Sequence, residues 1–189
     1  PRTTPKTSSA ASDVYRRQAH IAGLPVRIFR ISFTGELSYE INIRARHGLA
    51  LWTHLMKAGA EFGITPYGTE AMHVLRAEKG FIIVGQETDG SVTPQDLGMD
   101  WIVSKVKPDY IGKRALERAS MAADNRKQLV GLRTKERKQV IPEGAHAVLD
   151  PNQPMPMDML GQVTSSYYSP NVGNSIAMAM LKGGRALMG

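Results

Sequence analysis

The pattern of apolar residues changes between residues 122 and 127, and this change constrains the fold more than any other feature of the sequence. Beyond it, short apolar runs are separated by Pro, Gly, Asn and Asp; the runs are "QLVGL", "HAVL", "GQVTSS" and "SIAMAML". Runs of this length at these intervals are typical of a small antiparallel β domain. We therefore predict a small, truncated β-barrel domain over residues 125–189 and a domain of different construction over residues 21–124.

Residues 21–124 combine strand-like and helix-like segments, which indicates an α+β domain with an antiparallel sheet. Apolar and polar residues alternate closely enough to predict strands over 25–33 and 37–43. The "TGE" between them predicts a tight turn, in which Gly35 is free to take a positive φ. The buried-looking run "FIIVG" predicts a further strand over residues 80–84.

Helices are predicted where apolar residues recur with a period near 3.6. This spacing occurs over residues 48–59 and again over 68–79, where Gly80 is placed to end the helix. The segment "KRALERASMAAD" predicts a third helix from Lys113 to Asp124. By contrast, residues 1–20 open with "PRTTPKTSSAASD", which has no apolar period and predicts a frayed or disordered N-terminal segment. Both ends of the sequence look cut, so we expect a piece of a longer polypeptide.

Composition excludes several classes of function. The sequence has no cysteine, so it offers no disulfide, thiolate metal site or cysteine nucleophile. No His, Asp or Glu cluster has metal-ligand spacing, and neither a dinucleotide nor a triphosphate loop motif occurs. The apolar runs are far shorter than the roughly 20 residues of a membrane span. The net charge of +7 is dispersed, with "KERK" the only tight cluster, which favours a solvated basic face over a nucleic-acid surface. We expect a cytoplasmic protein without a membrane or nucleic-acid partner.

Two charged residues have alternative interpretations on spacing alone. Glu40 lies on the second predicted strand, where it is either a solvated carboxylate or an acceptor for two parallel N–H donors of a planar heterocycle. Arg76 lies on the second predicted helix, where it either pairs with Glu78 or another acidic residue or contacts an anionic ligand.

Four motifs occur in order along the chain: "FTGELSYEI", "GTEAMHVLRAEKG", "TPQDLGMDWIVSKVKPDYIGKRAL" and "LGQVTSSYYSPNVGNSIAMAML". Together they resemble the motifs of the glycine-cleavage T-protein family. In detail, "EKGFIIVGQETDG" and "VTSSYYSP" followed by "KGGRALMG" resemble the carboxy-terminal region of the alpha subunits of heterotetrameric sarcosine oxidases. The resemblance implies a T-protein-like aminomethyltransferase fold, with an antiparallel sheet and helices followed by a small β barrel.

The resemblance also implies a function. Such a region binds tetrahydrofolate, and the parent enzyme captures the one-carbon unit from the oxidative demethylation of sarcosine as methylenetetrahydrofolate. FAD, FMN and NAD belong to other parts of the parent complex, and the implied partners are the other subunits of the heterotetramer.

The family's residues carry over to particular positions. Its pterin-binding glutamate falls on Glu40, and its tyrosine falls on Phe33, which keeps an apolar wall but lacks the hydroxyl. Its two helical arginines fall on Met72 and Arg76, so one charged contact to folate is absent. Its tryptophan falls on Trp101, which either contacts folate or packs only in the core; the two alternatives stay open, with the core favoured.

The family's catalytic aspartate belongs to a segment upstream of residue 1, so the resemblance places no catalytic residue here, and we expect the isolated chain to be inactive. Two alternatives stay open: a structural or subunit-docking module without folate binding, to which Met72 points, and a fragment of another T-protein-family aminomethyltransferase. A third class, the folate-dependent iron–sulfur and tRNA-linked proteins, has the signature "K-G-C-Y-x-G-Q"; "EKGFIIVGQE" lacks its cysteine.

Overall fold

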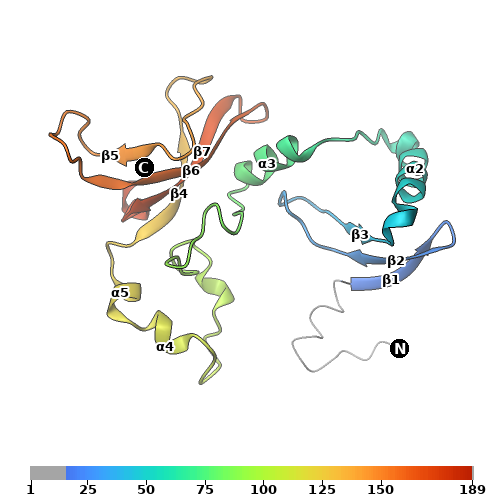
Figure 1. Ribbon diagram of the computed structural model, residues 1–189, viewed down its shortest axis with the longest axis horizontal. Coiled ribbons are helices and arrows are strands. Elements are labelled where there is room, and N and C mark those ends of the chain that lie inside the picture. Colours follow the sequence, from blue (N-terminus) through green and yellow to red (C-terminus); the bar gives the residue numbers. More distant parts are fainter. Residues whose placement is uncertain (1–15, 189) are drawn as a thin grey trace. The chain divides into compact units, whose positions relative to one another are not determined.

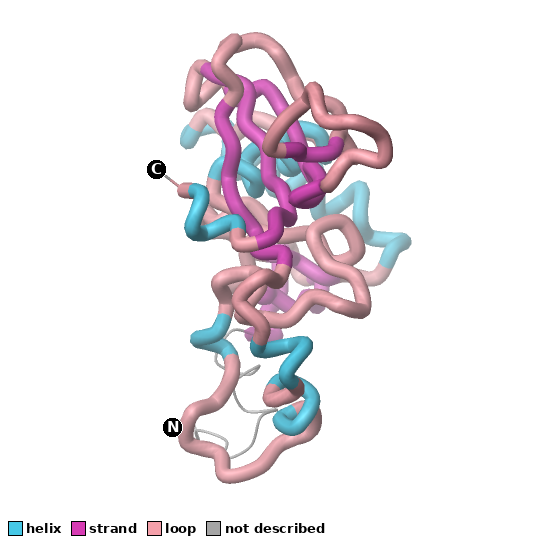
Figure 2. Tube along the Cα trace, turned by 90° about the vertical axis from the view of Figure 1, so that its left-hand side faces the viewer, coloured by secondary structure: helices cyan, strands magenta, loops and turns pink. Residues whose placement is uncertain are grey.

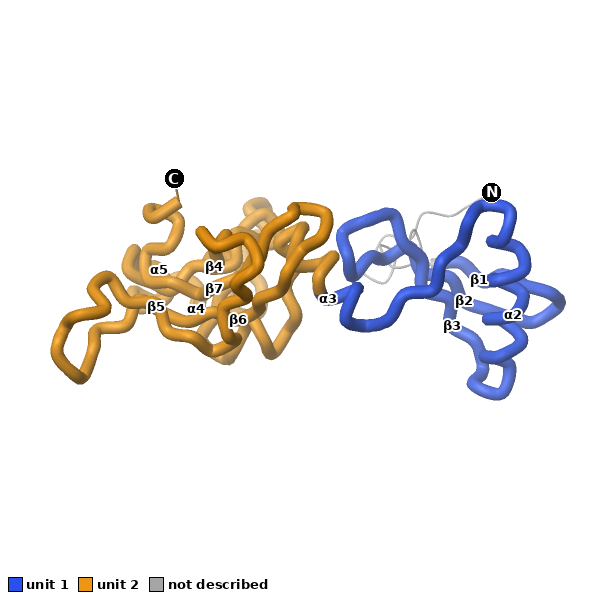
Figure 3. The backbone as a smooth tube through the Cα atoms, turned by 90° about the horizontal axis from the view of Figure 1, so that it is seen from above, with its two compact units in different colours: residues 1–73 blue, residues 74–189 orange. Residues whose placement is uncertain are grey.

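The computed structural model describes residues 16–188 (Figure 1). It divides into two compact units, residues 1–73 and 74–189 (Figure 3). The division falls within helix α3, Thr69–Glu78.

Unit 1 contains a three-stranded antiparallel sheet in the order β1-β2-β3. Its strands are β1 Arg16–Ile21, β2 Leu24–Phe29 and β3 Glu40–Asn42. The turn between β1 and β2 consists of Ala22 and Gly23 at φ +50° and +78°, the left-handed conformations that a two-residue hairpin turn requires. The two predicted strands are therefore present but shorter, and β1 was not predicted.

The connection between β2 and β3 is longer than the predicted tight turn. It covers residues 30–39, and the predicted "TGE" lies within it. Gly35 has φ +85°, as its position in a turn predicts. Residues 1–15 of the predicted disordered segment lie outside the described residues, and residues 16–20 belong to β1, so that segment does not extend to residue 20.

The two long predicted helices are confirmed. Helix α2 spans Gly48–Gly59, flanked by the short 3-10 helices η1 Ala45–His47 and η2 Ala60–Phe62. Helix α3 ends as predicted at Gly80, which has φ +72°. The Gly80 N–H donates to Ala77 O at 3.0 Å and the Phe81 N–H donates to Arg76 O at 2.9 Å, the paired bonds of a Schellman motif.

Two predictions for the segment after α3 were wrong. Residues 81–83 are irregular and residues 84–87 form a turn, so the strand predicted over 80–84 is absent. A side chain and a local bond satisfy the backbone of Ile83: its N–H donates to the Glu87 carboxylate at 2.7 Å, and its carbonyl accepts from the N–H of Glu87. The predicted third helix is two short helices, α4 Lys113–Leu116 and α5 Ala119–Ala122, because Arg118 between them is extended at ψ 139°. The 3-10 helix η3 Asp100–Ile102 precedes them.

The remainder of unit 2 is mostly β, which confirms the prediction from the apolar runs. Its sheet has the order β4-β7-β6-β5, and all neighbours are antiparallel. Strands are drawn in magenta in Figure 2. The strands are β4 Lys127–Arg133, β5 His146–Val148, β6 Met159–Ser169 and β7 Asn174–Lys182, followed by the 3-10 helix η4 Gly184–Leu187. A Cβ at Gly161 of β6 would lie 1.8 Å from Met180 O of β7, so this position admits only glycine.

Both faces of this sheet are covered, which explains why every residue of β7 except Lys182 is buried. Alternate residues of a strand point to opposite faces. One buried cluster contains Val130, Val163, Ala177, Ala179 and Leu181. The other joins Ile176 and Met178 of β7 to Ala77 of α3. The second half of α3 therefore packs on the sheet of unit 2.

No helix within residues 16–188 is long and apolar enough to cross a membrane.

Candidate functional site

Glu40 is the first residue of β3, an edge strand of the unit 1 sheet, where it pairs with Phe29 of β2. Its side chain is exposed, and within residues 16–188 it makes no hydrogen bond or ion pair. The two carboxylate oxygens are therefore available to an external donor. The exposed Glu40 side chain agrees with the interpretation as a solvated carboxylate. A contact between Glu40 and a pterin stays a prediction.

Phe33 lies in the connection between β2 and β3, and local contacts fix its backbone. The Gly35 N–H donates to the Ser32 hydroxyl at 2.9 Å, and the neighbouring Thr34 is buried. The Phe33 ring is 39% exposed, and its centroid lies 6.2 Å from that of His73, with a 37° angle between the planes. The same connection borders a surface hollow of about 320 Å³. Phe33 thus presents one part of its ring to solvent and packs another against the first half of α3.

The sequence gives no metal-ligand signal at His73, because His73 has no histidine partner at metal-ligand spacing. The only available signal was its position one residue after Met72, on the helix that carries a family motif.

Arg76 lies in unit 2 and is completely buried, with 0% exposure. Its guanidinium donates to the Glu87 carboxylate at 3.0 Å and to Phe81 O at 3.1 Å. It also donates to the hydroxyls of Ser165 at 2.6 Å and Tyr167 at 3.3 Å, and it lies 5.8 Å from the Tyr167 ring centroid. Glu87 is buried as well and accepts from Ser165 Oγ. Removing one member of such a buried pair leaves an uncompensated charge.

The acidic partner of Arg76 is Glu87 and not Glu78. Glu78 accepts hydrogen bonds from Ser169 at 2.5 Å and Asn171 at 2.9 Å, which tie the end of α3 to the end of β6 and the turn beyond it. Within the described residues, Nε of Arg76 is the one buried side-chain polar atom without a hydrogen-bond partner. A contact between Arg76 and folate stays a prediction of the motif. The hydrogen bonds of Arg76 to Glu87 and Ser165 inside unit 2 do not favour it.

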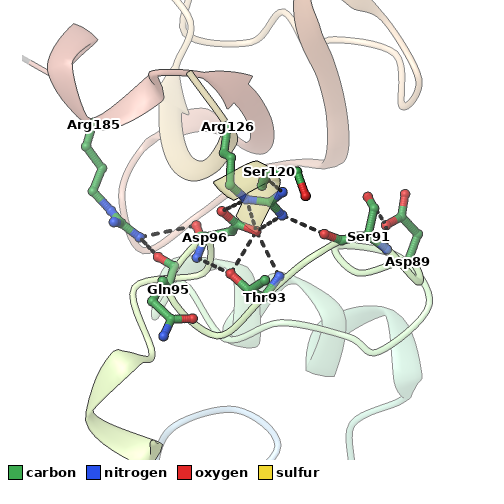
Figure 4. A network of polar contacts seen from close by, with 8 residues as sticks. All are labelled: Asp89, Ser91, Thr93, Gln95, Asp96, Ser120, Arg126 and Arg185. Carbon is green, nitrogen blue, oxygen red and sulfur yellow. Dashed lines mark hydrogen bonds and ion pairs between the residues drawn. The ribbon is translucent and has the colours of Figure 1, made fainter. Parts of the chain in front are cut away.

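Asp96 is the centre of a second polar network in unit 2 (Figure 4). Its carboxylate accepts from the Thr93 N–H at 2.8 Å, from the Thr93 hydroxyl at 3.0 Å and from Arg126 at 2.5–3.1 Å. Arg126 also donates to Ser91 O and Ser120 O. Arg185 donates to the carbonyls of Gln95 and Asp96, so the network joins the 91–96 loop to the start of β4 and to η4.

Asp96 and Arg126 form an ion pair in this network, and each shifts the pKa of the other. Burial alone would raise the pKa of Asp96, but the hydrogen bonds and charge of Arg126, with the two bonds from Thr93, lower it below its ordinary value. The hydrogen bond to Asp96 raises the pKa of Arg126. A cavity of about 430 Å³ lies beside the network, bordered by Asp89, Asp96, Arg126 and Lys127 among others. Because Asp96 and Arg126 satisfy each other, their pair is a structural connection between loop and sheet.

Trp101 lies in η3 and is 73% exposed. The favoured core position was therefore wrong, because η3 leaves the indole on the surface of unit 2. A contact of Trp101 with a ligand stays a prediction.

Unit 1 holds Phe33 and Glu40, and unit 2 holds Arg76 and Trp101. No group of three His, Cys, Asp or Glu side chains suited to a metal ion occurs in residues 16–188.

Comparison with family models gives two matches. Residues 4–107 match the model described as GCVT N-terminal domain, and residues 127–189 match the glycine cleavage T-protein C-terminal barrel domain. The matches leave a gap between residues 107 and 127, which contains α4 and α5.

Curated relatives and a solved structure agree with these matches. Sarcosine oxidase subunit alpha of Corynebacterium sp. (strain P-1) is 52% identical over 172 residues, which cover 89% of this chain and 18% of that protein. An aminomethyltransferase of Halothermothrix orenii is 34% identical over 169 residues, 89% of this chain and 45% of the relative. The crystal structure of glycine cleavage system aminomethyltransferase T from Bartonella henselae superposes with a TM-score of 0.69 at 26% identity, covering 83% of this chain and 42% of that one. The chain thus spans less than half the length of each.

Proposed function

Because the chain belongs to the glycine cleavage T-protein family, we propose that it is the tetrahydrofolate-binding part of a sarcosine oxidase alpha subunit. The observation that carries the proposal is the 52% identity over 172 residues with sarcosine oxidase subunit alpha, against 34% with an aminomethyltransferase. The parent protein would oxidise sarcosine with a flavin held elsewhere in the complex. The region described here would hold the tetrahydrofolate that captures the one-carbon unit as methylenetetrahydrofolate.

Glu40 and Phe33 are the proposed pterin contacts. A carboxylate accepts two parallel N–H donors, and a pterin presents such a pair in its ring N–H and amino group. The Glu40 carboxylate is exposed and has no partner in the described chain, so it can accept both without breaking an existing bond. The partly exposed Phe33 ring would form an apolar wall. The exposed indole of Trp101 is a further proposed contact.

The proposal includes partners and location. The other subunits of a heterotetrameric oxidase are the proposed partners, FAD, FMN and NAD would be held in other parts of that complex, and the complex would be cytoplasmic. No catalytic residue is assigned to this chain.

The test uses the full-length protein, purified with any subunits that accompany it. With sarcosine and oxygen, we expect free formaldehyde without tetrahydrofolate and methylenetetrahydrofolate when tetrahydrofolate is added. A protein that oxidises sarcosine but does not bind tetrahydrofolate would overturn the proposal. That result would instead support a subunit-docking module without folate binding, which Met72 at the arginine position favours. A protein that transfers an aminomethyl group but does not oxidise sarcosine would support the aminomethyltransferase alternative.

A further inference from the structure

We propose that His73, rather than Arg76, is the side chain through which helix α3 contacts folate, an inference that rests on the proposed function. The family motif assigns charged contacts on this helix to positions 72 and 76. In this chain the first is Met72, which has no polar atom to donate.

Arg76 is committed to the interior of unit 2. Both terminal nitrogens of its guanidinium already donate to groups of the protein, and its side chain has no exposed surface. Turning the guanidinium toward a ligand would leave the Glu87 carboxylate buried without its cation. Arg76 is therefore a residue that fixes α3 on the sheet of unit 2.

His73 has the opposite surroundings. It lies in unit 1, partly buried, with its ring packed against Phe33. Among residues 16–188, neither of its ring nitrogens has a hydrogen-bond partner.

The other histidines provide a comparison. His47 is also partly buried but accepts a hydrogen bond from Arg46 at 3.0 Å, and His54 contacts Ala50 O at 2.7 Å from an exposed position. His20 and His146 are exposed. Of the five histidines in the sequence, all within the described residues, His73 alone combines partial burial with ring nitrogens that the protein leaves unpaired.

The chemistry of imidazole fits a folate next to Phe33. A neutral imidazole has one N–H donor and one acceptor nitrogen. Glu40 can only accept while ionised, so it matches the donors of the pterin and offers nothing to folate's carbonyl and carboxylate oxygens. An N–H of His73, beside the same aromatic wall, would supply a donor to one of those oxygens. His73 is thus a specificity-determining contact that the family motif does not define.

Two variants separate this contact from the packing of His73 on Phe33. His73→Phe keeps an aromatic ring against Phe33 and removes both nitrogens, whereas His73→Gln keeps a side-chain N–H. In the full-length protein with its accompanying subunits, we expect His73→Phe to weaken tetrahydrofolate binding about three- to ten-fold, the effect of one lost hydrogen bond. We expect His73→Gln to stay within about two-fold of the wild type and the control His54→Phe to be unchanged, because His54 is exposed on α2.

If His73→Phe folds poorly, chemical modification of the wild-type protein tests the same contact. Diethyl pyrocarbonate modifies accessible imidazoles, and mass spectrometry locates the product. We expect saturating tetrahydrofolate to protect His73 and not His54. Wild-type affinity in a stable His73→Phe variant, or equal modification of His73 with and without tetrahydrofolate, would overturn the inference while tetrahydrofolate still binds. Absence of binding in the wild type would overturn the proposed function itself.

Discussion

Glu40 in unit 1 and Arg76 in unit 2 belong to motifs of one family, yet their surroundings are opposite. Glu40 is exposed on an edge strand and has no partner in the described chain, whereas Arg76 is fully buried and donates to four groups of its own unit. A charged side chain whose hydrogen bonds are all made within the protein stabilises the fold. A charged side chain without a protein partner is available to a ligand. The comparison predicts that substitution of Arg76 affects stability and that substitution of Glu40 affects binding.

The largest expected effect is that of Arg76→Met. It leaves Glu87 buried without a counter-ion, and breaking a buried pair in this way costs about 3–5 kcal/mol. For a unit of this size we expect the melting temperature of the purified protein to fall by about 12–20 °C. The control Arg133→Met, at an exposed position of β4, should change it little. An unchanged melting temperature for Arg76→Met would remove the distinction between the two units.

Asp96→Asn is expected to have an effect of intermediate size. It should lower the free energy of unfolding by about 2 kcal/mol at pH 7, because charge-assisted bonds to Arg126 are lost. The sign of the pH dependence follows from the lowered pKa of Asp96. Its contribution is fully present above the ordinary value of 3.8 and is lost as the pH falls through the lowered value. Thermal unfolding between pH 7 and pH 3 should therefore show the variant and the wild type converging in acid.

The control for this measurement is Asp124→Asn, an exposed carboxylate two residues before Arg126. It should follow the wild type at every pH. A constant difference between Asp96→Asn and the wild type down to pH 3 would show that the ion pair is not its cause.

A free-energy change smaller than that of Arg76→Met is expected for Glu40→Gln, at least about 1.4 kcal/mol and all of it in binding. The substitution places an amide donor opposite donors of the pterin, so tetrahydrofolate affinity should fall at least about ten-fold. The melting temperature and the rate of sarcosine oxidation without folate should stay at wild-type values, while released formaldehyde increases at the expense of methylenetetrahydrofolate. Unchanged folate affinity would return Glu40 to the role of a solvated carboxylate.

Much of the fold could be predicted, because both helices and the four strands of unit 2 have strong periodicity bounded by Gly and Pro. The failures have local causes. Residues 80–84 look like a buried strand, but residues 81–83 are irregular and the Glu87 carboxylate accepts from the N–H of Ile83. β1, with the sequence "RRQAHI", has no apolar alternation, because it is an edge strand of the sheet.

The site was predictable only in part. Motif matching identified Glu40, Phe33 and Arg76, but burial is a tertiary property and could not be read from the motifs. The pairing of Arg76 with Glu87 depends on the turn at residues 83–87, which returns the chain toward α3 and brings together residues eleven positions apart. His73 occupies a position that the family motif leaves unspecified, and its significance depends on where the β2–β3 connection places Phe33.

The central position of β7 has a consequence for the dynamics of unit 2. This strand is hydrogen-bonded to β4 on one side and to β6 on the other, and all but its last residue are buried. No partial opening that leaves the sheet intact can expose its amide protons to solvent. Deuterium should therefore enter β7 only when the whole sheet unfolds, so that the exchange rate of these amides reports the global opening free energy of the unit.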